Sequence, residues 1–188
     1  MPARSDRRRW SYAEFARLPS DDGNRYEIIA GALYVTPAPR PLHQHVIRQL
    51  LDRLGRFVDS HRLGWVLPGP IDILFAEGDY LEPDLVFVRR ERRGIITDRG
   101  LEEAPDLVVE VLSASTAARD RGIKRERYAL YGVPEYWVAD PDEQRIEVHR
   151  PQEDPATVRI HTDVLTWAPA ADGPTLEISV PAVLAGFD

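Results

Sequence analysis

Two acidic residues lie inside apolar stretches of this sequence, where a charged side chain is unexpected. Asp84 stands in the segment EPDLVFV (82–88), and Glu110 stands in PDLVVEVLS (105–113). A buried and unpaired carboxylate costs on the order of several kcal/mol, so each acid is expected to be neutralised, paired or bound to a cation. Two plainer alternatives remain: Asp84 follows a proline and could cap a turn, and Glu110 could pair with an arginine.

Lys124 is the third residue whose type could take part in a reaction. It is the single lysine among 24 Lys and Arg residues, and an amine has a pKa that its surroundings can shift, unlike a guanidinium. On a helix from residue 120, Asp120, Lys124, Tyr128 and Tyr131 share one stripe. The two tyrosines favour a lysine that faces inward. The alternatives are a surface pair between Asp120 and Lys124, and a lysine count that reflects chance alone.

The composition is that of an ordinary folded chain. Its 188 residues are 43% hydrophobic and 29% charged, which predicts a basic, flexible arm over residues 1–10 and a single domain over residues 11–188. No apolar run is long enough to cross a bilayer, and none follows the basic N-terminus as in a signal peptide. Because cysteine is absent, a metal would be held by carboxylates, His or carbonyls. We expect a cytoplasmic protein without a membrane partner.

Charge is unevenly distributed along the chain. The net charge of −7 argues against a protein that coats nucleic acid by bulk electrostatics. Two basic clusters nevertheless follow the segments of the buried acids. We expect nucleic-acid contacts from members of these clusters, namely Arg89, Arg90, Arg119, Arg121 and Arg125. The alternative is that both clusters are solvated faces.

The elements that must position these residues follow from hydrophobic periodicity and turn signals. The patterns predict a short helix over 12–18, a hairpin within 26–35, an amphipathic helix over 43–58, strands between 65 and 88, a central strand over 106–113, a helix over 120–131, a hairpin of 135–140 with 145–150, and strands near 157–162 and 175–180. This order predicts an α/β fold in which helices flank a mixed central sheet.

Together these segments resemble a known family. EPDLVFV, PDLVVEVLS and RDRGIKRERYALYGVPEYWVAD are similar to the Uma-two group of putative restriction endonucleases, in the PD-(D/E)XK nuclease superfamily. The resemblance covers roughly residues 10–185, and its most specific element is the order Val-Glu-Val-Leu-Ser, then Lys, then Gly-Val-Pro-Glu-Tyr-Trp. It implies a restriction-endonuclease-like fold with an N-terminal hairpin extension.

The resemblance also implies roles for individual residues. Asp84 and Glu110 match the two acidic positions of the superfamily's site, and Leu112 stands where an acid-X-Lys triplet would place its lysine. Lys124 matches the position to which this group moves that lysine. Glu27 matches an auxiliary acid. His43 matches a histidine of the group, although a histidine on an apolar helix face is also a common core residue.

Such a set implies metal-dependent hydrolysis of phosphodiester bonds. Hard oxygen ligands suit Mg²⁺ or Mn²⁺, held by Asp84, Glu110 and the backbone carbonyl of Val111. Lys124 would orient or deprotonate a water. DNA is the expected substrate, and a homodimer is the expected assembly, because cutting both strands commonly takes two sites.

Two other classes of function compete with this interpretation. The first is a catalytically inactive nuclease-like module that binds nucleic acid or protein, which the acidic net charge and the displaced lysine favour. The second is a hydrolase whose two carboxylates act as acid and base on a sugar, which ranks lower because Lys124 would then have no role.

Overall fold

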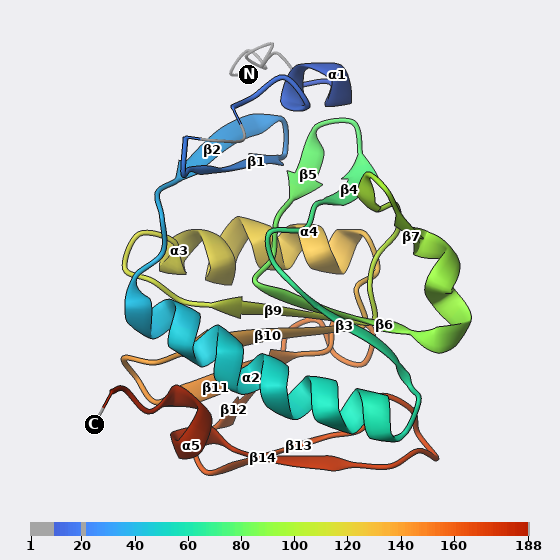
Figure 1. The fold of residues 1–188 in the computed structure, drawn as a ribbon, viewed down its shortest axis with the longest axis vertical. Coiled ribbons are helices and arrows are strands. Elements are labelled where there is room, and N and C mark those ends of the chain that lie inside the picture. The colour runs from blue at the N-terminus through green and yellow to red at the C-terminus, as the bar shows by residue number, and fades with distance from the viewer. Residues whose placement is uncertain (1–9, 20–21, 188) are drawn as a thin grey trace.

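The structure, a computed structural model, describes residues 10–19 and 22–187 and has a mixed α/β architecture (Figure 1). Its helices are α1 (Tyr12–Phe15), α2 (Pro41–Ser60), η1 (Arg90–Ile95), α3 (Ala117–Arg119), η2 (Asp120–Lys124), α4 (Arg125–Leu130) and α5 (Val180–Leu184). Its strands are β1 (Arg25–Ile29), β2 (Ala32–Thr36), β3 (Gly64–Pro68), β4 (Ile73–Ala76), β5 (Asp79–Leu81), β6 (Leu85–Arg89), β7 (Ile96–Thr97), β8 (Gly100–Leu101), β9 (Leu107–Val111), β10 (Glu135–Asp140), β11 (Arg145–His149), β12 (Val158–His161), β13 (Val164–Trp167) and β14 (Leu176–Ser179).

The strands form two six-stranded sheets and a separate hairpin. The first sheet has the order β12-β11-β10-β9-β6-β3, the second has the order β2-β1-β5-β4-β8-β7, and β13 pairs with β14. In the first sheet β9 and β10 are parallel, whereas β6 runs antiparallel to β9. The sheet is therefore mixed, as the sequence predicts.

The central strand β9 is buried on both faces. The alternation of side chains along the strand determines which face carries Glu110. Val109 and Val111 belong to the hydrophobic cluster that contains α2, whereas Val108 and Leu112 belong to the cluster that contains Tyr128 of α4. Because side chains alternate along a strand, Glu110 lies on the same face as Val108 and Leu112. Glu110 thus faces the helix that carries the lysine.

That helix runs without a break from Ala117 to Leu130 and contains a π-helical turn, η2. It begins three residues before the predicted start at 120. Both Asp120 and Lys124 are buried within the π turn. Single π turns inside α-helices occur frequently at functional sites.

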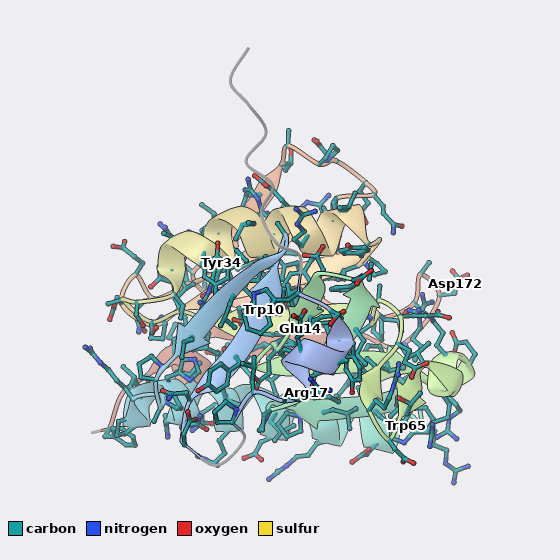
Figure 2. The ribbon with its side chains drawn as sticks, turned by 90° about the horizontal axis from the view of Figure 1, so that it is seen from above. Trp10, Glu14, Arg17, Tyr34, Trp65 and Asp172 are labelled. Atoms are coloured by element: carbon teal, nitrogen blue, oxygen red, sulfur yellow. The ribbon has the colours of Figure 1, made fainter. Side chains whose placement is uncertain are left out.

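The N-terminal hairpin lies above the first sheet, toward the top of the molecule (Figure 1). Strands β1 and β2 turn at Ala30 and Gly31, which have φ angles of 52° and 80°, the left-handed conformation that a two-residue hairpin turn requires. Seen from above, α1, which carries Glu14, lies over this layer, and Trp10 lies near it (Figure 2). Trp10 packs against the apolar cluster of Ile28, Leu74 and Tyr80.

The C-terminal region differs most from the sequence prediction. Strand β14 was expected near 175–180, but its partner β13 and the helix α5 were not expected. Most of the predicted basic arm, residues 1–9, lies outside the described residues, so the domain division stays a prediction. Among the helices of the described residues, none is both long and apolar enough to cross a membrane.

The β13–β14 hairpin, which the sequence patterns do not predict as a pair, covers the core beneath α2. The contribution of this hairpin to the core can be tested at Trp167 of β13. This side chain is 1% exposed and packs against Phe57, Phe87 and Trp137, with ring centroids 5.2 to 6.0 Å away. Truncation leaves a large cavity, so Trp167→Ala should lower the free energy of unfolding by about 3–5 kcal/mol. Urea denaturation measures this change.

Ile160 on the edge strand β12 provides the control for this measurement, because it is 57% exposed. Ile160→Ala should change the unfolding free energy by less than about 0.5 kcal/mol. Equal losses in the two variants would show that Trp167 is not a core residue.

Candidate active site

Asp84 lies directly before β6 and is fixed by three donors. Its Oδ1 accepts a hydrogen bond from the Arg25 guanidinium at 2.8 Å, and its Oδ2 accepts one from the backbone N–H of Val111 at 2.8 Å. The Nε2 atom of His43 lies 3.2 Å from Oδ2. Burial alone would raise the pKa of Asp84, but the His43 hydrogen bond and Arg25 outweigh it and lower the pKa to about 2. Asp84 is therefore held as a carboxylate.

Glu110 projects from the middle of β9 toward the helix. Its Oε1 accepts a hydrogen bond from the Tyr128 hydroxyl at 2.8 Å and is in direct contact with the Lys124 ammonium. Burial, supported by the nearby Asp120 and Asp84, raises the pKa of Glu110 well above its usual value in spite of Lys124. The charged form of Glu110 is thus disfavoured chiefly by burial, and a further cation beside the carboxyl would favour that form.

Lys124 is the centre of the ion-pair cluster. Besides Glu110, its Nζ contacts Oε1 of Glu27 at 2.8 Å and Oδ1 of Asp120 at 3.8 Å. Its side chain is only 2% exposed. Burial favours the neutral amine, but the Glu110 and Glu27 carboxylates prevail and raise the pKa of Lys124. The residue is an ammonium, and the surface pair with Asp120 considered from sequence is not what the structure has.

Glu27 reaches this cluster from β1 of the hairpin. Its carboxylate also accepts the backbone N–H of Glu82 at 3.0 Å, and Arg119 lies 3.5 Å away. Burial acts to raise the pKa of Glu27, but Lys124 and Arg119 exceed this effect and lower the pKa. Hairpin, central strand and helix are thereby joined through one ammonium.

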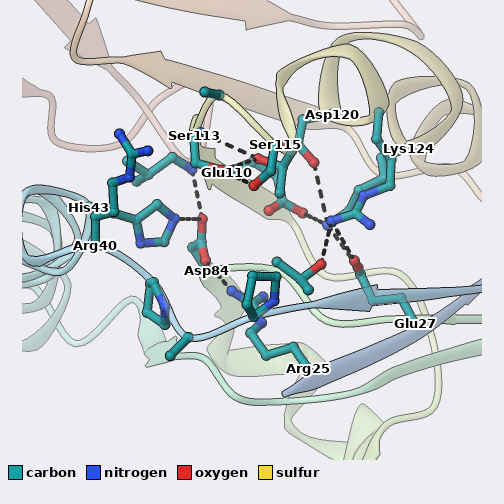
Figure 3. Close-up of a pocket in the computed structure, with 18 residues that line it drawn as sticks. Arg25, Glu27, Arg40, His43, Asp84, Glu110, Ser113, Ser115, Asp120 and Lys124 are labelled. Carbon is teal, nitrogen blue, oxygen red and sulfur yellow. Dashed lines mark hydrogen bonds and ion pairs between the residues drawn. The ribbon is translucent and has the colours of Figure 1, made fainter. Parts of the chain in front are cut away.

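These groups line a cavity of about 290 Å³. Figure 3 shows Asp84 and His43 on one side of it, with Glu110, Lys124 and Glu27 meeting on the other. The wall is completed by Val111, by Arg25, by residues 36–40 at and after the end of β2, and by residues 113–116, Arg119 and Asp120 at the start of the helix. All catalytic and metal-binding residues predicted from sequence therefore line this one cavity, together with the auxiliary residues Glu27 and His43.

The first arginine cluster lies elsewhere. Arg89 ends β6, and because β6 runs antiparallel to β9, it lies beside Asp106 at the end of β9 remote from Glu110. The Arg89 Nε donates to Asp106 at 2.7 Å, so Asp106 is a pairing residue and not a ligand. The Arg90 Nε donates to the carbonyl of Arg62 at 2.7 Å.

The second cluster divides around the helix. Arg119 lines the cavity, donates to Oγ1 of Thr36 at 2.7 Å and lies over the ring of Tyr34. Arg121 points away from it and pairs with Glu147 at 2.7 Å. Arg125 is exposed and makes no ion pair within the part of the chain that the structure describes. Of the five predicted arginines, only Arg119 lies at the cavity.

Sequence reasoning missed Arg25. Arg25 and Glu27 are alternate residues of β1 and point to the same side of the strand. The charge pattern RYE could therefore have indicated that Arg25 lies beside the auxiliary acid Glu27. Tyr128 was recognised only as a member of the helix stripe, not as the donor to Glu110. Neither partner could be assigned without knowing that the hairpin folds over the sheet.

A divalent ion is the cofactor that the donor types fit. Among the described residues, no three His, Asp or Glu side chains already converge as a metal cluster. Asp84 and Glu110 nevertheless supply the hard oxygens that Mg²⁺ or Mn²⁺ prefers. Burial is the main cause of the raised pKa of Glu110, and the nearby carboxylates of Asp120 and Asp84 add to it. A cation bound at Glu110 would favour its ionised form.

The buried ammonium gives a direct stability test. Lys124→Met leaves Glu27 and Glu110 without their cation and should lower the free energy of unfolding by about 3–5 kcal/mol near pH 7. Without Lys124, burial raises the pKa of Glu110 further above its ordinary 4.5, so the folded variant holds a proton that the unfolded chain releases. The deficit relative to the parent protein should therefore shrink as pH falls toward 5.

Arg48→Met is the matched control, because Arg48 and Asp52 form an exposed pair on α2 at 2.8 Å. This pair should contribute less than about 0.5 kcal/mol. Urea denaturation of both variants at several pH values checks the result, and a Lys124 variant as stable as the Arg48 variant would contradict the buried cluster.

Comparison with known proteins places this chain in a family. The sequence matches the Uma2 family model, described as "Putative restriction endonuclease", over residues 12–181. Among solved structures, "a putative nuclease belonging to DUF820 from Anabaena variabilis ATCC 29413" matches with a TM-score of 0.75 at 20% identity, covering 93% of this chain and 97% of that chain. No curated protein matches the sequence.

The structural match confirms the predicted restriction-endonuclease-like fold, and the family match covers nearly the whole chain. The protein is therefore a nuclease-like member of the Uma2 family of putative restriction endonucleases.

Proposed function

We propose that this protein is a metal-dependent endonuclease that hydrolyses phosphodiester bonds in DNA. The observation that carries the proposal is the buried Lys124 ammonium, which contacts Glu27 and Glu110 in the cavity that also holds Asp84. A buried amine among carboxylates is costly for stability alone. Its presence in a cavity, in a family of nuclease-like proteins, supports a chemical role.

Asp84, Glu110 and the carbonyl of Val111 would hold Mg²⁺ or Mn²⁺. When bound, the ion lowers the pKa of a coordinated water and polarises the scissile phosphate. Arg25 now occupies one oxygen of Asp84 at 2.8 Å. The guanidinium also contacts the carbonyl and the carboxylate of Glu82, and these contacts hold it at the cavity, where it would bind a phosphate oxygen, an anion that a guanidinium binds well.

The protein's own residues act by position and charge. Lys124, as an ammonium, orients the attacking water and offsets negative charge that develops on the phosphorane. Tyr128 fixes the rotamer of Glu110 through its hydroxyl, and His43 does the same for Asp84. Arg119 holds a phosphate next to the scissile bond. The roles of Arg89, Arg90, Arg121 and Arg125 as outer phosphate contacts, a cytoplasmic location and a homodimer stay predictions from sequence.

A second function, an inactive module that binds nucleic acid or protein, has one observation in its favour. Both oxygens of Asp84 already have protein donors, so the carboxylate is satisfied without a metal. Calorimetric titration with Mn²⁺ separates the two functions. The nuclease should bind the ion and lose that binding in Glu110→Gln, whereas an inactive module needs no binding that depends on Glu110.

The activity test uses purified protein with Mg²⁺ or Mn²⁺ and DNA. Asp84→Asn, Glu110→Gln and Lys124→Met should each lower the cleavage rate at least about 100-fold, because each removes a group that holds or balances charge in the transition state. Asp52→Asn, an exposed carboxyl on α2, is the control and should leave the rate unchanged. Cleavage that survives in all three site variants would come from a contaminant and would refute the proposal.

A further inference from the structure

The candidate catalytic groups are buried where they line the cavity. The side chains of Asp84, Glu110 and Lys124 are exposed by only 2%, 4% and 2%. The cavity holds about 290 Å³, at the lower limit of the pockets that bind small molecules. A phosphate must therefore enter the protein to meet these groups, because none of them reaches out to the surface.

Three residues of the hairpin, Arg25, Glu27 and Thr36, line the cavity, and we call them its roof. Arg25 of β1 forms an ion pair with Asp84, and Glu27 of β1 forms one with Lys124, each at 2.8 Å. Thr36, at the end of β2, accepts a hydrogen bond from Arg119 at 2.7 Å. These contacts join the hairpin to the sheet and to the helix, as Figure 3 shows for Arg25, Glu27 and Lys124.

Of the five arginines predicted to contact nucleic acid, only Arg119 lines the cavity. Proteins that bind duplex DNA typically neutralise about six to ten phosphates. Here the cluster at Arg90 and Arg93 packs around Trp65, which Figure 2 places on the opposite side of the molecule from Tyr34 of the hairpin. Arg121 is paired with Glu147.

The polar groups at the opening instead suit one or two phosphates. Arg40 is exposed and makes no ion pair among the described residues. The Ser113 hydroxyl lies 3.1 Å from the hydroxyls of both Ser115 and Thr116, and these three residues line the same cavity as Arg40. Hydroxyls and a guanidinium are common partners of phosphate oxygens.

We propose that the substrate of this site is an unpaired strand and not an intact duplex. This inference rests on the proposed function. A duplex is stiff and carries its phosphates on the outside of a wide cylinder, so its scissile phosphate cannot pass below the roof without unstacking and unpairing the neighbouring base. An unpaired strand can rotate one phosphate out of line and insert it at little cost.

The test compares two circular DNAs of the same sequence, one single-stranded and one a relaxed, covalently closed duplex, with Mn²⁺. Circles remove free ends, and relaxation removes the strand opening that supercoiling causes. The protein should cleave the single-stranded circle at least about tenfold faster per site. The small diester bis(p-nitrophenyl) phosphate, which needs no unpairing, reports the chemistry by itself.

The outcomes separate this inference from the proposed function. Hydrolysis of the small diester that depends on Glu110, combined with equal cleavage of both circles, would overturn the unpaired-strand substrate and leave the nuclease. No hydrolysis of any of these substrates that depends on Glu110 would overturn both.

A binding measurement supplies a readout that does not require turnover. In fluorescence anisotropy, the Glu110→Gln protein should bind an unpaired oligonucleotide at least about tenfold more tightly than a blunt hairpin duplex. Adding Arg40→Gln should weaken the binding of the unpaired strand. Arg159→Gln, which removes the same charge from the edge strand β12, should not. Equal or tighter binding of the duplex would contradict the proposal.

Discussion

The ammonium of Lys124, buried between two carboxylates, is the interaction on which the rest of the site depends. It joins Glu27 of the hairpin, Glu110 of the central strand and the helix that carries it. Moving an amine and two carboxylates out of water costs more than most buried contacts return, so the cluster is stable only when every partner is present. Together with the pairing of β1 with β5, this cluster holds the hairpin over the sheet and so contributes to the shape of the cavity.

The same contacts that assemble the site also limit what can reach it. The groups proposed to hold the ion and the water are nearly without solvent exposure, and the hairpin that supplies Glu27 forms the roof above them. A site built in this way favours substrates that can present a single phosphate. Exclusion of water also strengthens the electrostatic interactions on which the proposed hydrolysis relies.

Much of this arrangement could be predicted from the sequence, because burial makes charged residues conspicuous. Glu110 stands out among valines, and the tyrosines on the Lys124 stripe indicate an inward lysine. The pairing of Arg25 with Asp84 could not be predicted, because it links residues 59 positions apart through a hairpin whose location no local pattern gives. The placement of Arg89 depends on strand direction: antiparallel pairing of β6 with β9 carries it to the far end of the sheet. The strand β13 was missed because residues 164–167 are too short a run to show a clear alternation.

The most direct test is crystallographic, with Mn²⁺ located by its anomalous scattering. We predict one strong peak in the cavity, within coordination distance of both Asp84 and Glu110, with the Lys124 amine beside an ordered water on the ion. A crystal saturated with Mn²⁺ that shows no peak between these two carboxylates, or an ion bound only at surface acids, would contradict the proposed metal-dependent site.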